Sequence, residues 1–205
     1  MGFDVETQGR SLGAWPPWLF LAGGVLLVGH AAMLAAETFG AVSVPPDVFA
    51  PLGHLLAVLG LVGLVGVLGR RRRRALRALA LPTLAGWLLV TGAQTARLLG
   101  FAPAEGPLPE AVAVALVALT TLTYGLVALV GYRTGVYGPL VTGLVAAPAV
   151  LLVALVVNGA VFGAPPAGTM LVAGGLAVAQ LGLGTALRHR GSAGRGAAAP
   201  GHAGG

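Results

Sequence analysis

The sequence predicts an all-α membrane protein, a polytopic transmembrane bundle of six helices joined by short loops. Six apolar runs of about 20 residues occupy most of the 205-residue chain, and a helix of about that length crosses the hydrocarbon core of a bilayer. Hydrophobic residues make up 57% of the chain and charged residues only 9%. Because lipid cannot satisfy backbone polar groups, we expect these runs to be helical. The expected spans are residues 17–38, 47–69, 78–101, 110–131, 139–162 and 168–187.

The first three spans are bounded by tryptophan, proline and arginine. Trp15 and Trp18 flank the start of the first span, and the amphipathic indole ring favours the headgroup region. The leader before this span carries Asp4 and Glu6 against Arg10, which is a poor basic region for a signal peptide. We therefore expect the first span to be retained. The second span follows a Pro-rich loop, and a run of arginine separates it from the third span.

The last three spans are bounded by aromatic and proline residues. Tyr132 and Tyr137 bracket Arg133 between the fourth and fifth spans. Pro139 falls at the start of the fifth span, where its missing N–H costs little. A Gly/Ala-rich basic tail follows the sixth span, and its composition is typical of disorder. The predicted segments are a cytoplasmic N-terminal segment, the transmembrane domain and a disordered basic cytoplasmic tail: 1–16, 17–187 and 188–205.

The distribution of arginine predicts how the bundle is oriented. The chain has 12 basic residues, all of them arginine, and a net charge of +6. If the loop between the second and third spans is cytoplasmic, Arg97 is the only arginine toward the outside. The positive-inside rule then favours a multi-pass protein of the cytoplasmic (cell) membrane with both termini inside. The loop arginines that we expect to meet anionic lipid headgroups are Arg70, Arg71, Arg72, Arg73, Arg74 and Arg77.

Composition and motifs exclude several functional classes. The chain has no cysteine, which removes disulfides, thiolate metal sites and iron–sulfur clusters. The arginine run lies between two spans, so we expect no nucleic-acid partner. Ser11, Ser43 and Ser192 are the only serines and none lies in a nucleophile elbow. We therefore expect no catalytic residues and favour a non-enzymatic role.

Glycine and alanine predict close packing between the helices. Gly53, Ala57 and Gly60 form a small-residue stripe on the second span, and Gly23 and Gly24 lie side by side on the first. Small residues let helix backbones approach each other in lipid, where no hydrophobic effect drives the helices together. We expect these stripes to pack within one bundle. A homo-oligomer or a membrane partner subunit is the alternative use of such a stripe.

Polar residues within the spans concentrate toward the expected outer ends. His30 and Glu37 are seven residues apart and share one face of the first span, and Asp47 and His54 do so on the second. Both histidines then lie roughly 10 Å below the outer boundary, at about 1.5 Å per residue. Ionisable groups in a bilayer usually face the bundle interior or a wet cavity. The predicted outward-facing polar pocket contains His30, Glu37, Asp47, His54, Thr91, Gln94, Thr95, Arg97 and Asn158.

Polar side chains also occur deeper in the spans. Thr120, Thr123 and Tyr124 give the fourth span a polar patch. We expect the threonines to bond the backbone of their own helix, and Gln180 of the sixth span to bond a neighbouring helix. Trp87 lies well inside the third span, away from both of its ends.

The two histidines allow more than one chemistry. The leading interpretation is a membrane subunit or small transporter-like module, in which His30, Glu37, Asp47 and Arg97 relay protons or contact a substrate. A second interpretation is a redox protein, in which His30 and His54 are the axial ligands of a haem b. A third is a Zn or Fe site formed by His30, His54 and Glu37. The structural alternative is that the histidines bond across helices and Arg97 pairs with Glu37 or Asp47.

The segment from Glu37 to Gly63, ETFGAVSVPPDVFAPLGHLLAVLGLVG, joins a Pro-rich outer loop to a Gly/Leu-rich span. It resembles uncharacterised small multi-pass membrane protein families of archaea and GC-rich bacteria. The resemblance covers about a quarter of the chain. It implies a multi-pass membrane protein and transfers no catalytic residue.

Overall fold

The computed structural model describes residues 15–40, 47–101, 110–163 and 165–196, and the secondary structure of this part of the chain consists of helices without strands. Six of these helices are long and apolar enough to cross a membrane, which confirms the predicted all-α fold of six span-length helices. A short 3-10 helix, η2 (Val65–Val67), continues the second helix. The long helices are α1 (Pro16–Thr38), α2 (Phe49–Leu64), α3 (Arg70–Leu98), α4 (Glu110–Arg133), α5 (Pro139–Phe162) and α6 (Pro166–Gly196).

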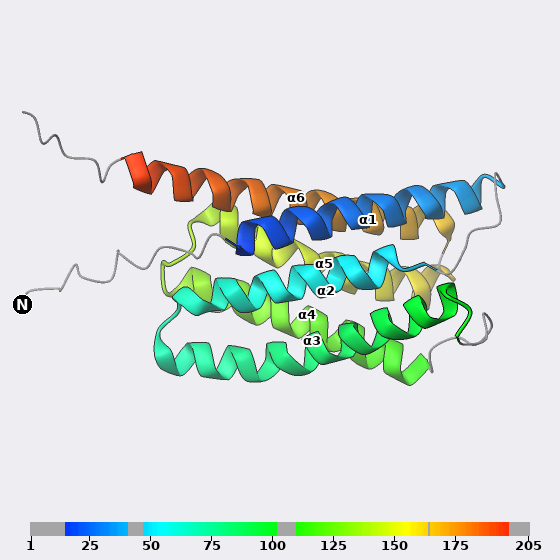
Figure 1. Cartoon of the computed structure of the whole chain (residues 1–205), viewed down its shortest axis with the longest axis horizontal. Coiled ribbons are helices and arrows are strands. Elements are labelled where there is room, and N and C mark those ends of the chain that lie inside the picture. The colour runs from blue at the N-terminus through cyan, green and yellow to red at the C-terminus, as the bar shows by residue number, and fades with distance from the viewer. Residues whose placement is uncertain (1–14, 41–46, 102–109, 164, 197–205) are drawn as a thin grey trace, which may run out of the picture.

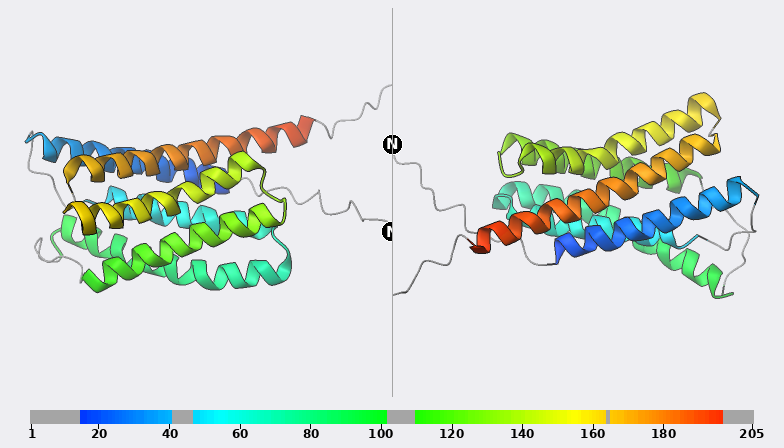
Figure 2. Two further views of the ribbon diagram at one scale, coloured as in Figure 1. Left: turned by 180° about the vertical axis from the view of Figure 1, so that it is seen from behind. Right: turned by 90° about the horizontal axis from the view of Figure 1, so that it is seen from above.

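The helices run up and down in one bundle (Figure 1). Each helix packs against its neighbours in sequence, and α1 also packs against α6, so the ring of helices is closed. Figure 2 shows α1 and α6 side by side along much of their length. The bundle therefore has two distinct ends. We call the end where α3 begins the arginine end, and the end where α1 ends and α2 begins the acidic end, after Glu37 and Asp47.

Two helices extend beyond the predicted spans at the arginine end. The arginine run was predicted as a loop, but it forms the first two turns of α3, which begins at Arg70. Arginine is a strong helix former, and Arg73 Nη1 donates a hydrogen bond to the Gly66 carbonyl oxygen at 3.4 Å. The tail was predicted to be disordered from residue 188, yet α6 continues to Gly196. The predictions for residues 1–14 and 197–205 lie outside the described residues.

Glycine sets the closest approaches between helices, as the small-residue stripes predict. A Cβ atom on Gly23 of α1 would lie 2.8 Å from the Gly53 carbonyl oxygen and 3.3 Å from the Ala57 nitrogen, both in α2. A Cβ atom on Gly184 of α6 would lie 2.8 Å from the Pro17 carbonyl oxygen of α1. These contacts place the helix backbones against each other inside the bundle, where any larger residue would push them apart.

The outward surface of the bundle is apolar. Leu89 of α3 is 74% exposed and Leu171 of α6 is 77% exposed, and further aliphatic side chains are exposed on α1, α3, α4, α5 and α6. Such an extended apolar surface is unusual for a soluble monomer. An apolar surface of this kind around span-length helices is what a bilayer environment requires.

The arginine end is tied together by polar contacts. Buried Tyr137, in the α4–α5 connection, donates its hydroxyl hydrogen bond to the Leu64 carbonyl oxygen of α2 at 2.9 Å. Burial raises the pKa of Tyr137, so the hydroxyl keeps its proton as a donor. The guanidinium carbon of Arg188 in α6 lies 4.2 Å from the ring centroid of Trp18 in α1. These contacts join α2 to the α4–α5 connection and α6 to α1.

Candidate functional site

Asp47 joins the start of α2 to the second half of α1 at the acidic end. Its Oδ1 atom accepts hydrogen bonds from the Phe49 nitrogen at 2.8 Å and the Ala50 nitrogen at 3.3 Å. These are among the first N–H groups of α2, which have no partner within the helix. The other carboxylate oxygen, Oδ2, lies 2.5 Å from His30 Nδ1. One carboxylate therefore holds the beginning of α2 and the imidazole of α1 together.

The electrostatic balance at this contact keeps Asp47 ionised. Burial alone would raise its pKa, but the contact with His30 and the N–H groups of Ala50 and Phe49 outweigh that effect and hold the pKa below its ordinary value. The side chains of His30 and Asp47 remain 21% and 28% exposed. The pair is thus open to the surroundings at the acidic end.

His54 lies deeper than this pair, in the second turn of α2, and is only 8% exposed. It is within electrostatic reach of both His30 and Asp47. Its ring stacks on the indole of Trp87 in α3, with 4.4 Å between centroids and 22° between planes. The Trp87 Nε1 atom donates to Thr120 Oγ1 of α4 at 2.9 Å. Side chains from α1, α2, α3 and α4 thus follow one another from the acidic end into the bundle.

Further polar contacts lie beyond this row of side chains, which consists of His30, Asp47, His54, Trp87 and Thr120. The Thr83 and Thr123 hydroxyls are 2.9 Å apart and join α3 to α4. Gln180 Nε2 of α6 donates to the Tyr124 hydroxyl of α4 at 3.0 Å, so the expectation that Gln180 bonds a neighbouring helix is confirmed. Thr123 also donates to the carbonyl oxygen of Leu119 in its own helix at 2.7 Å, as expected.

The charged residues predicted for the pocket occupy different surroundings. Glu37 lies in the last turn of α1 and is exposed, whereas Asp47 is half-buried against His30. The structure therefore pairs His30 with a carboxylate across the helices rather than with Glu37 on its own helix. Arg97 is half-buried in the last turn of α3, and Gln94 is half-buried one turn earlier.

The remaining predicted pocket residues make local or distant contacts. Thr91 donates its hydroxyl hydrogen bond to the Trp87 carbonyl oxygen at 2.7 Å, and Thr95 donates to the Thr91 carbonyl oxygen at 2.8 Å. Asn158 of α5 lies against α6, where a Cβ atom on Gly168 would collide with its side chain. Among the nine predicted residues, the interactions described above bring together His30, Asp47 and His54.

The described side chains do not assemble the predicted three-ligand metal site. Within the described ranges, no three His, Asp or Glu residues lie close enough to hold a metal ion. Glu37 is about two helical turns beyond His30, and its side chain is exposed. The contact with Asp47 occupies His30 Nδ1. The Nε2 atom is the ring nitrogen left for a proton or a ligand.

Trp87 and Thr120 are the two members of the row that the sequence did not assign to the site. A signal for Trp87 exists in the spacing of α3, where Thr83, Trp87, Thr91 and Thr95 recur every four residues and so share one helix face. This stripe includes Thr83 and Trp87, which bond to α4. The spacing alone does not reveal which neighbouring helix the stripe faces.

Comparisons with known proteins add no family assignment. No family model matches the chain, and no curated protein or solved structure matches it either. The resemblance of residues 37–63 to small multi-pass families stays a prediction. The contacts of the chain's own residues therefore carry the functional argument.

Proposed function

We propose that this chain is a small transporter-like module of the cytoplasmic membrane that takes up protons at its outer end, with both termini inside. Arg97 apart, the arginines whose side chains the structure describes belong to the arginine end. The positive-inside rule therefore places that end at the cytoplasm. The acidic end, with His30 and Asp47, then faces outward.

The observation that carries the proposal is the Asp47 carboxylate beside His30, within electrostatic reach of buried His54. Imidazole is the side chain whose charge changes most readily around neutral pH. Ionisable groups inside membrane spans are costly and often mark proton or ion pathways. A partly exposed histidine above a buried one provides an entry group and an inner acceptor. Asp47 holds the entry imidazole in place.

The contacts below His54 favour a module that changes conformation during proton transfer. They do not favour an open proton channel. The Trp87 indole N–H is a donor only and cannot accept a proton from His54. Thr120 accepts the Trp87 hydrogen bond and donates to the Leu116 carbonyl oxygen at 2.7 Å, so its own proton is engaged. A proton that reaches His54 can therefore pass further only if α2 and α3 shift and unstack the His54–Trp87 pair.

Proton uptake can be tested on the purified chain in phosphatidylglycerol/phosphatidylcholine vesicles that contain a pH-sensitive dye. An outward-acidic gradient should acidify vesicles that carry the wild-type chain faster than empty vesicles. The variant His54→Gln should fall to the rate of empty vesicles, and Asp47→Asn should be intermediate. His189→Gln is the matched control, since it makes the same change at the arginine end. Equal rates for His54→Gln and the wild-type chain would contradict the proposal.

A redox function is the second candidate, and the His30–Asp47 contact is the observation that favours it. A carboxylate on one imidazole nitrogen is a common arrangement behind metal-ligating histidines. The redox function is tested by an optical spectrum and metal analysis of the purified wild-type chain and of a His30→Ala variant. A reducible Soret band or stoichiometric metal that the variant loses would establish His30 as a haem or metal ligand and replace the proton proposal.

A further inference from the structure

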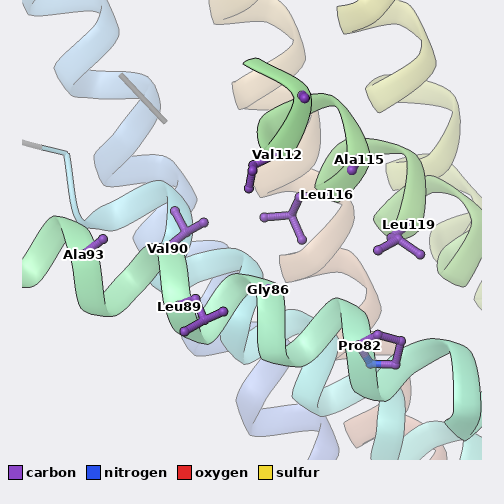
Figure 3. A pocket seen from close by; sticks show the side chains of 10 residues that line it. Pro82, Gly86, Leu89, Val90, Ala93, Val112, Ala115, Leu116 and Leu119 are labelled. Carbon is purple, nitrogen blue, oxygen red and sulfur yellow. The ribbon is translucent and has the colours of Figure 1, made fainter. Parts of the chain in front are cut away.

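A lateral groove separates α3 from α4 on the apolar surface of the bundle. It encloses roughly 490 Å³ (Figure 3). Pro82 and Leu119 line its deep end, and Ala93 and Ala111 line the end nearer the acidic side. Small residues on both helices leave the space open, and the lining carries almost no polar surface.

Hydrogen bonds next to the deep end fix the spacing of the two helices there. Thr83 bonds Thr123, and Trp87 bonds Thr120, so α3 and α4 are held together just beside Pro82 and Leu119. From that point the groove extends toward the acidic end between the two helices. It is therefore a feature of the bundle itself, set by polar contacts on its inner side.

The dimensions and position of the groove match one leaflet of a bilayer. From Pro82 to Ala93, α3 rises about 16 Å at about 1.5 Å per residue, which is close to half of a hydrocarbon core about 30 Å thick. The rim residues Leu89 and Val112 are 74% and 47% exposed on the surface that faces lipid. An apolar groove in this position excludes water and accepts an acyl chain.

A positive charge lies above the groove at headgroup level. Arg97 is one turn beyond Ala93 and on nearly the same face of α3, in the last turn of the helix. It is the one described arginine at the acidic end, where a lipid phosphate would be its electrostatic complement. We infer that this groove binds one phospholipid, with an acyl chain between α3 and α4 and the phosphate group at Arg97. The site is separate from the proton site on α1 and α2.

Native mass spectrometry of the full chain tests this inference. The chain is purified in detergent and supplied with phosphatidylglycerol or, as a probe that lacks phosphate, diacylglycerol. We expect the wild-type chain to retain one phosphatidylglycerol. Ala115→Phe fills the groove from α4 and should reduce the bound fraction at least tenfold, and Ala93→Phe should do so from α3. Ala118→Phe places the same ring on an exposed α4 position outside the groove and should bind like the wild-type chain.

The charge is tested by a separate variant. Arg97→Gln should lower phosphatidylglycerol binding to the level of diacylglycerol, while diacylglycerol binding stays unchanged. Helix content by circular dichroism identifies any variant that fails to fold, and the two groove-filling variants on different helices check each other. Equal phosphatidylglycerol binding by the wild-type chain, Ala115→Phe, Ala93→Phe and Ala118→Phe would overturn the inference. So would a wild-type chain that retains no phospholipid.

Discussion

Replacing Gly23 with alanine tests the close contact on which the α1–α2 arrangement depends. A Cβ atom at this position would lie 2.8 Å from the Gly53 carbonyl oxygen, whereas ordinary contacts begin at 3.4 Å. The difference, 3.4 minus 2.8, means that the two backbones must separate by about 0.6 Å. A gap of roughly 0.5–1 Å forfeits about a quarter to a half of the dispersion energy of each contact affected. Because α1 and α2 are held by packing in lipid, this loss weakens the bundle directly.

The magnitude follows from two opposing terms. Forcing an extra methyl group into a filled contact costs about 1–3 kcal/mol. Alanine returns up to about 1 kcal/mol of helix propensity relative to glycine. The difference between the two terms means that Gly23→Ala should lower the free energy of unfolding by up to about 2 kcal/mol.

A matched glycine on α5 provides the control for this change. Gly143 is exposed, and a Cβ atom there would meet nothing within 4 Å. Gly143→Ala should raise the free energy of unfolding by about 0.5–1 kcal/mol, since only the propensity gain applies. Unfolding in mixed micelles with increasing dodecyl sulfate, followed by circular dichroism, measures both variants. The packing argument is wrong if Gly23→Ala proves as stable as Gly143→Ala.

Three further predictions concern the two ends of the bundle. Tyr137→Phe removes the donor to the buried Leu64 carbonyl oxygen and should cost about 1–2 kcal/mol in the same unfolding titration; an unchanged midpoint would show that the bond is not stabilising. Arg188→Gln removes the cation from the Trp18 ring and should lower the free energy of unfolding by about 0.5–1 kcal/mol. In a chain that already carries Trp18→Leu, the same substitution should not lower it. Because the pKa of Asp47 is below 3.8 in the folded chain, its contribution is fully present above pH 3.8 and is lost as pH falls through the folded pKa. The wild-type chain should therefore lose stability below about pH 4 relative to Asp47→Asn, and parallel pH profiles would contradict this.

The sequence predicted the six helices because each apolar run is long enough to be recognised as a membrane-spanning segment. Their limits at the arginine end were predicted less well, since hydropathy marks where a span leaves lipid and not where a helix ends. Arg70 begins α3 and Gly196 ends α6. Both lie well outside the apolar runs, because a helix satisfies its own backbone in water as well as in lipid.

The sequence predicted which site residues share a face of one helix, but it did not predict which residues of different helices meet. Asp47 was predicted to share one face of the second span with His54, but it lies before α2, which begins at Phe49, and contacts His30 of α1 from there. Pairing across helices depends on how α1 is rotated against α2. The contact of Gly23 with Gly53 fixes that rotation, and it becomes visible only in three dimensions.

Orientation in the membrane is the central claim, because the outward proton site depends on it. The chain has no cysteine, so single cysteines can be introduced without background and labelled with a membrane-impermeant maleimide on intact cells. Phe39, 78% exposed at the acidic end, and Ala75, exposed in the second turn of α3, are suitable positions. We predict that Phe39→Cys is labelled on intact cells and Ala75→Cys only after permeabilisation. The reverse pattern, or labelling of both from the same side, would contradict the proposed topology.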